Sequence, residues 1–185
     1  RFISLGGSGE KSITMKGAGG WVYGIRTDTS GKITVDGGGS LTIKNETGYD
    51  NPSAISAKGV VTLNADVTLT DFKHGVYNNA ETLTTEDKAD IQITGGTIKI
   101  TCTKDGSDGL WSTNNRVAVS GGTVNISTKD SAIAAKKGGL DVTGAPTVTL
   151  SADGSYASYA NTGTNTIDLT SGGSVTATSS FTVSK

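Results

Sequence analysis

Several residue types that define common classes of protein are scarce in this sequence of 185 residues. A single cysteine, Cys102, excludes an internal disulfide framework and a cysteine-based zinc site. Because Cys102 follows the alternation of its apolar neighbours, we interpret it as a buried hydrophobic residue. A single histidine, His74, has no partner for a site built on two histidines. No run of about 18 apolar residues occurs, so the sequence predicts no membrane insertion.

Neither sign of charge dominates the sequence. Lys and Arg together number 16 and Asp and Glu 17, for a formal net charge of −1. This balance creates no basic field, so we expect no nucleic-acid partner. Only 34% of the residues are apolar, whereas glycine is abundant, with 27 residues. The combination predicts a thin core that needs few inward side chains per structural unit.

A unit of 24 to 31 residues repeats about six times along the chain, and its clearest copy runs from Gly95 to Gly122. Three apolar columns recur in these units. The first column holds Ile13, Leu41, Val67, Ile98, Val124, Val148 and Val175. The second, in which each aliphatic follows a Gly or Ala, holds Ile25, Ile55, Val76, Leu110 and Ile133. The third holds Ile33, Val61, Ile91, Val117, Leu140 and Ile167.

Apolar and polar residues alternate within these columns, as they do from Ile98 through Ile100 to Cys102. Side chains alternate between the two faces of a strand, so each run is predicted to be a short strand with one buried face. No stretch has a sustained helical period, and the turns are rich in Gly, Asn, Asp and Ser. The sequence therefore predicts an all-β fold, a three-sided β-solenoid of about six coils of 24–31 residues. A β-sandwich is the alternative, but it would not require the same columns in every unit.

Residues 1–185 are predicted to form a single solenoid domain. Residues 1–11 would lead into the coils, residues 12–173 would form them, and residues 174–185 would add a terminal strand or half-coil. An insertion in the third coil is expected to form a protruding acidic loop, with Glu81, Glu86, Asp87 and Asp90 against Lys88. No strong capping helix is visible in the sequence. Open ends expose unpaired backbone groups, so end-to-end self-association is one expected mode of assembly.

Acidic residues recur in the turn between the first and middle strands of successive coils. They are Asp50, Asp71, Asp105, Asp108, Asp130 and Asp153. Adjacent coils lie about 4.8 Å apart, so stacked carboxylates would repel one another unless a cation neutralised them. Calcium accepts about six to eight oxygen ligands, including carboxylates, so the sequence predicts Ca²⁺ along this edge. The alternative is that Asp is simply a common turn residue, and the same turns contain Lys73, Lys104 and Lys129.

The outward face of the middle strands is a second candidate site. If the second-column aliphatics point inward, the residues that follow them point outward: Arg26, Ser56, Tyr77, Trp111 and Ala134. With a floor of small residues and with Lys58 and Lys136 alongside, this column would form a shallow trough. The expected floor consists of Gly24, Ala54, Gly75, Gly109 and Ala132. Tyr77 and Trp111 suit stacking on sugar rings, and the basic residues suit the carboxylates of acidic sugars. The alternative is that the two aromatic residues only pack on each other.

Catalysis is not expected from the residues present. His74 stands where Ser53, Asp108 and Ser131 stand in other coils, so we interpret it as a polar residue at the edge of a turn. A β-helix lyase would need only calcium and a basic residue to take a proton from a uronate. The candidates for that base are Arg26, Lys58, Arg116 and Lys136. No feature of the sequence marks one of them as a base, so the expected protein is not an enzyme.

Three stretches share one sequence pattern: residues 53–66 (SAISAKGVVTLNAD), residues 108–128 (DGLWSTNNRVAVSGGTVNIST) and residues 131–152 (SAIAAKKGGLDVTGAPTVTLSA). The pattern, over about residues 40–173, resembles the carbohydrate-binding parallel β-helix family of bacterial cell-surface proteins. The resemblance implies a right-handed parallel β-helix akin to calcium-dependent pectate lyases, and non-catalytic, calcium-dependent binding of polysaccharides. The family's Asp-Asp-Gly-Ile step falls on residues 107–110, where only the second acid, Asp108, is kept.

The expected function is therefore a non-catalytic, calcium-stabilised polysaccharide-binding module for acidic plant or cell-wall glycans. A chain rich in Thr, Ser, Asn and Gly and nearly free of Cys suits an exported bacterial protein, so we expect an extracellular or cell-surface location. The alternative is a structural β-solenoid, such as an adhesin stalk or a filament subunit. Glycan binding and filament formation are the observations that separate the two hypotheses.

Overall fold

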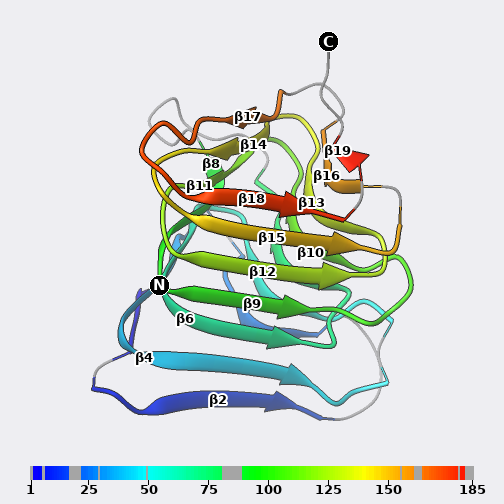
Figure 1. The fold of residues 1–185 in the computed structure, drawn as a ribbon. Helices are drawn as coiled ribbons and strands as arrows, with labels where there is room; N and C mark the ends of the chain where they lie inside the picture. Colours follow the sequence, from blue (N-terminus) through cyan, green and yellow to red (C-terminus); the bar gives the residue numbers. More distant parts are fainter. Residues whose placement is uncertain are drawn as a thin grey trace.

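The structure, a computed structural model, consists of stacked β-strands. It describes all residues except 1, 6, 17–21, 29, 49, 81–88, 155, 161–163, 179 and 182–185. The described residues form nineteen strands and no helix, and every strand pair is parallel. The coils stack along one axis into a parallel β-helix of about six turns (Figure 1). This confirms the predicted β-solenoid.

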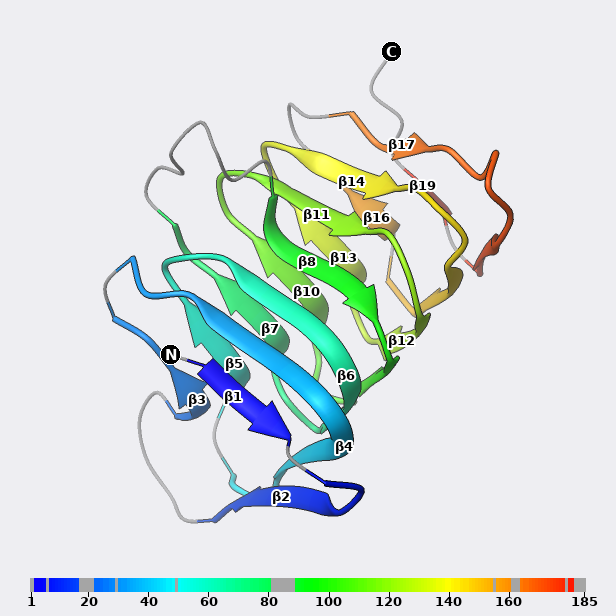
Figure 2. The same cartoon turned by 90° about the vertical axis from the view of Figure 1, so that its left-hand side faces the viewer.

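The strands form three columns in two sheets (Figure 2). Sheet B holds the seven middle strands, β3 (Tyr23–Arg26), β5 (Ser53–Ala57), β7 (His74–Asn78), β10 (Asp108–Ser112), β13 (Ser131–Ala135), β16 (Tyr156–Tyr159) and β19 (Ser180–Phe181). Sheet A holds twelve strands. Its first column contains β2 (Glu10–Met15), β9 (Thr97–Thr101), β12 (Thr123–Thr128), β15 (Thr147–Ala152) and β18 (Ser174–Ala177). Its third column contains β1 (Phe2–Leu5), β8 (Ala89–Gly95), β11 (Arg116–Val119), β14 (Gly139–Val142) and β17 (Thr166–Ile167). Two long strands belong to both columns, because they continue from the third column into the first: β4 (Ile33–Asn45) and β6 (Val61–Thr70).

The Gly-Gly pairs of the repeat lie at the corner between the third and first columns. Gly96 and Gly122 have φ angles of 72° and 79°, in the left-handed region that disfavours side chains. A Cβ on Gly96 would also overlap the carbonyl oxygen of Ala65 in the preceding coil. Glycine is therefore required for the chain to turn this corner and enter the strand that begins with Thr97 or Thr123.

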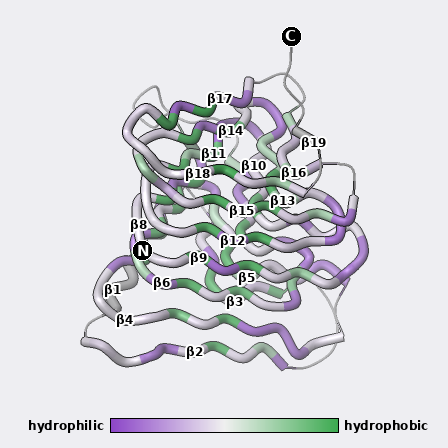
Figure 3. The backbone as a smooth tube through the Cα atoms, viewed as in Figure 1, coloured by the Kyte–Doolittle hydropathy of each residue, from purple (hydrophilic) through white to green (hydrophobic). Residues whose placement is uncertain are grey.

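Aliphatic side chains from all three columns meet in one continuous core inside the coils. Along the strands, apolar residues alternate with polar ones, as the colouring of Figure 3 shows. Cys102 is buried in this core, as predicted, and burial raises the pKa of its thiol to about 12. Each fully buried Ile, Leu or Val side chain stabilises the fold by about 1.5–3 kcal/mol, so a thin core repeated in every coil is sufficient.

Two of the predicted alignments are wrong by two residues, one at each end of the solenoid. Ile13 pairs with Ile43 and not with Leu41, and Ile167 pairs with Val142 and not with Leu140. A shift of two residues leaves the same face of a strand buried, so apolar alternation alone does not distinguish the two registers.

Asp90 does not belong to a protruding acidic loop, contrary to the expectation from the sequence. It is buried at the start of β8, and its carboxylate accepts hydrogen bonds from the Ser112 hydroxyl (2.5 Å) and from the backbone and side-chain N–H groups of Asn115 (3.1 and 3.3 Å). The side chain of Asn78 donates to the carbonyl of Asp90 at 3.2 Å. Through these hydrogen bonds, Asp90 links the turns of two neighbouring coils. The other residues of the expected loop, 81 and 86–88, lie outside the described part.

Within the described residues, no helix is long and apolar enough to cross a membrane.

Candidate functional site: an aromatic face on sheet B

Sheet B presents one column of outward residues, each of which follows a second-column aliphatic. The parallel register stacks Arg26, Ser56, Tyr77, Trp111, Ala134 and Tyr159 in that order. Large side chains therefore flank Ser56 and Ala134, which are small and buried. This order leaves a gap above each of the two small residues, and the structure contains a hollow at each position.

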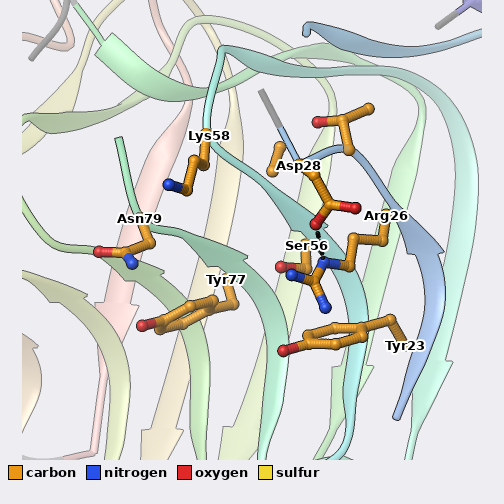
Figure 4. Close-up of a pocket in the computed structure, with 9 residues that line it drawn as sticks. Tyr23, Arg26, Asp28, Ser56, Lys58, Tyr77 and Asn79 are labelled. Atoms are coloured by element: carbon orange, nitrogen blue, oxygen red, sulfur yellow. Dashed lines mark ion pairs between the residues drawn. The ribbon is translucent and has the colours of Figure 1, made fainter. Parts of the chain in front are cut away.

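The first hollow lies over Ser56 and has a volume of about 360 Å³. Figure 4 shows the rings of Tyr23 and Tyr77 along one side, with Arg26, Lys58 and Asn79 around the other. The Arg26 guanidinium lies 4.3 Å from the centroid of the Tyr23 ring and its Nε lies 2.5 Å from an oxygen of Asp28. Burial, and to a lesser extent Tyr23, raises the pKa of Tyr77 above its ordinary 10.0, so its hydroxyl remains a neutral hydrogen-bonding group.

An aromatic ridge of Tyr77, His74 and Trp111 separates the two hollows. The His74 ring stacks on Tyr77 at 5.1 Å between centroids and at an interplanar angle of 29°, and it lies 5.2 Å from the Trp111 ring. His74 is only 8% exposed and belongs to strand β7. His74 is the first residue of β7, directly after the turn of residues 71–73, so its expected place at the edge of a turn is confirmed. In addition, its ring packs in the ridge.

The second hollow lies over Ala134 and Ser131 and has a volume of about 310 Å³. Trp111 stands on one side, and the rings of Tyr156 and Tyr159, with centroids 5.1 Å apart, stand on the other. The charged residues that line it are Asp108, Asp130 and Lys136. The Lys136 ammonium lies 3.9 Å from the centroid of the Trp111 ring, a cation–π contact.

The structure brings the five residues expected to bind carbohydrate to these two hollows. Arg26, Lys58 and Tyr77 line the first, and Trp111 and Lys136 line the second. The contact that the alternative expectation named is present as well, because the rings of Tyr77 and Trp111 lie 6.3 Å apart in neighbouring coils. The two aromatic residues therefore pack on each other and border a hollow at the same time.

The column of small residues does not form the floor of the face, contrary to the expectation. A Cβ on Gly24 or Gly75 would lie 2.8 or 2.7 Å from a methyl group of Ile43 or Ile100, respectively. Gly75 and Val76 therefore both face the interior, and the strict alternation of the strand fails at this step. The small residues let sheet B approach sheet A closely.

Four aromatic residues of the face are absent from the set predicted from the sequence. They are Tyr23, His74, Tyr156 and Tyr159. Extending the outward column by one coil, from Ala134 to Tyr159, would have identified the last of these. One candidate base of a lyase lies elsewhere, because Arg116 is on sheet A with its Nη2 2.5 Å from Asp141.

The aspartates expected to bind calcium do not form a continuous ladder. Asp50, Asp105, Asp130 and Asp153 are exposed, and Asp71 accepts a hydrogen bond from the Thr103 hydroxyl at 2.8 Å. The side chain of Lys73 donates to the carbonyl of Asp105 at 2.9 Å, and Lys129 is paired with Asp153. Asp108 is turned away from this corner and lines the second hollow.

Among the described residues, no three His, Cys, Asp or Glu side chains lie close enough to hold a metal ion together. Calcium on this edge stays a prediction from the sequence. The lysines observed beside Asp105 and Asp153 are the groups that the alternative expectation named for the same turns.

Comparisons with known proteins found no matching family model, no matching curated protein and no matching solved structure.

Proposed function

We propose that this protein is a non-catalytic polysaccharide-binding solenoid, exported from or displayed on a bacterial cell, and that the outer face of sheet B holds the glycan. The observation that carries the proposal is the pair of hollows, each bordered by aromatic rings and by charged groups. Aromatic rings stack on the apolar faces of sugars, while the polar groups beside them bind hydroxyls and carboxylates. The resemblance of the repeat to a carbohydrate-binding family supports the same function.

The register of the coils supports a ligand that is a polymer. Three coil steps separate Ser56 from Ala134, which places the two hollows about 14 Å apart. A glycan laid parallel to the solenoid axis would fill both hollows and cross the ridge of Tyr77, His74 and Trp111. Arg26 and Lys58 in the first hollow suit a carboxylate, which supports an acidic sugar at that end.

The experiment is a screen on a glycan array, followed by calorimetric titration of the best oligosaccharide. We expect Tyr77→Ala and Trp111→Ala each to weaken binding about tenfold, which corresponds to about 1.4 kcal/mol. Asn125→Ala is the control, because Asn125 is exposed on β12 of sheet A, away from the hollows. Circular dichroism verifies that the variants are folded. Unchanged affinity in both aromatic variants would refute the site.

A structural solenoid is the second candidate function. In the described part of the chain, the strands at the two ends of sheet B, β3 and β19, each pair with one neighbour only. Because all strands are parallel, one end of the molecule can pair with the opposite end of another copy, and such contacts form filaments. Filaments in electron micrographs of purified protein, together with no binding on the glycan array, would favour this function over the first.

A further inference from the structure

The two hollows differ in the sign of the charge that lines them. The first contains Arg26 and Lys58 against Asp28, an excess of one positive charge. The second contains Asp108 and Asp130 against Lys136, an excess of one negative charge. An acidic sugar suits the first hollow but does not suit the second.

The carboxylate of Asp108 is incompletely compensated. Asp108 is 2% exposed, and among the described residues its Oδ1 has no hydrogen-bond partner. Its Oδ2 lies 3.4 Å from Nδ1 of His74, which is charged only when the imidazole is protonated. A buried carboxylate without full compensation destabilises a fold, and a cation bound in the hollow that it lines would offset that cost.

Aromatic rings make the same hollow suitable for a cation. Trp111 faces Tyr156 and Tyr159 across it, and the face of an indole or phenol ring attracts an ammonium group. An ammonium group already occupies the Trp111 face, because Nζ of Lys136 lies 3.9 Å from the ring centroid. Lys136 thus shows where a cationic ligand group would sit, and it would compete with that group.

We propose that the second hollow binds the protonated amino group of an amino sugar, and that Lys136 is an internal competitor for this position. The inference rests on the proposed function, since it names the sugar that one hollow accepts. Asp108 and Asp130 supply the negative charge, and Trp111, Tyr156 and Tyr159 supply the aromatic faces. The preferred glycan then carries an anionic unit at the first hollow and a cationic unit at the second.

The test compares two disaccharides by calorimetric titration, a β-1,4-linked glucose dimer and a β-1,4-linked glucosamine dimer with protonated amines, because a dimer is too short to reach both hollows. We expect the glucosamine dimer to bind parent protein at least fivefold more tightly. Lys136→Gln removes the competitor, so we expect it to raise affinity for the glucosamine dimer about fivefold without raising affinity for the glucose dimer. Asp130→Asn is expected to lower affinity for the glucosamine dimer about fivefold.

The control is Lys99→Gln, which makes the same change of charge at an exposed position on β9 of sheet A. It should leave the ratio of the two affinities unchanged. If the glucose dimer binds but the glucosamine dimer binds no better, or if Lys136→Gln weakens glucosamine binding, the inference fails and the proposed function stands. The same holds if neither dimer binds while another glycan on the array does. If neither dimer binds and no glycan on the array binds, both fail.

Discussion

Gly75 shows how a single hydrogen atom in place of a side chain sets the distance between the two sheets. A Cβ at this position would lie 2.7 Å from both a methyl group of Ile100 and the carbonyl oxygen of Gly109. We therefore expect Gly75→Ala to lower the free energy of unfolding by about 1–3 kcal/mol, the usual cost of overpacking a core. Urea denaturation followed by circular dichroism measures the change.

Gly48→Ala is the matched control, because no described residue apart from its chain neighbours lies within 4 Å of a Cβ built on Gly48. This variant should be as stable as the parent or slightly more stable, since alanine restricts the unfolded chain. Equal stability of the two variants would contradict the interior placement of Gly75.

Asp90 is a second residue with a measurable signature. Burial raises its pKa above the ordinary 3.8, although hydrogen bonds from Ser112 and Asn115 act in the opposite direction. The folded state therefore holds the proton of Asp90 more tightly than the unfolded state does, so this residue makes stability fall as pH rises from 3.8 through its folded pKa. We expect Asp90→Asn to lose less stability than the parent does between about pH 4 and about pH 7.

The same urea titrations on Asp168→Asn provide a control of opposite sign. Hydrogen bonds from Thr170 lower the pKa of Asp168, so in the parent this residue contributes stability that is lost as pH falls. Because Asp168→Asn removes the carboxylate, this variant should lose less stability than the parent as pH falls. If Asp90→Asn and the parent show the same pH dependence, the buried carboxylate is not the group that titrates.

At the scale of the element, the lengths of the turns between sheet A and sheet B set which charged groups lie side by side at the acidic corner. The turn of residues 71–73 occupies the same register as the turn of residues 102–107, so the second is three residues longer. The extra residues bring Asp105 beside Lys73 and not above Asp71. The number of residues between each aspartate and the strand that follows it could not reveal this difference in position. Turn length varies from coil to coil without changing the register of the strands.

Calorimetry of chelator-treated protein tests the acidic corner. Because Lys73 lies beside Asp105 and Lys129 beside Asp153, we expect added calcium to raise the melting temperature by no more than about 1 °C. A rise of several degrees would establish the calcium sites that the spacing of the aspartates predicts. Magnesium at the same concentration controls for ionic strength.

The strands themselves were predictable because two faces with different solvent exposure impose a period of two on the sequence. The same period does not distinguish registers that differ by two residues, which is why apolar alternation aligns Ile13 and Ile167 with the wrong partners. The aromatic face was predictable in part, since Tyr77 and Trp111 follow the alternation of their strands. Packing of His74 between them was not, because it depends on ring orientations that no spacing encodes.

At the scale of the whole molecule, the principal strand pairings join each coil to the coil before it and the coil after it. A repeat that interacts only with its neighbours can be added without remodelling the others. Residues 124–147 span one full register step, since Val124 pairs with Val148. We expect a variant in which residues 124–147 are duplicated to fold and to be longer by about 4.8 Å, the spacing of adjacent strands.

Small-angle X-ray scattering measures the maximum dimension of this variant, and circular dichroism confirms its strand content. A duplication of residues 134–158, which is one register step in sheet B because Ala134 pairs with Tyr159, tests the register in a second way and should give the same result. An unfolded product or an unchanged dimension would contradict the additive stacking of coils.

The two hollows are vacancies in a column of side chains, so their separation is a whole number of coils. Three steps lie between Ser56 and Ala134, and no conformational change of a side chain alters that number. The spacing of ligand groups that the protein prefers is therefore fixed in units of one coil. Inserting one coil between Tyr77 and Trp111 would increase the preferred spacing of charged groups on the glycan by one coil step. In a series of variants with added coils, selectivity would therefore change in steps and not continuously.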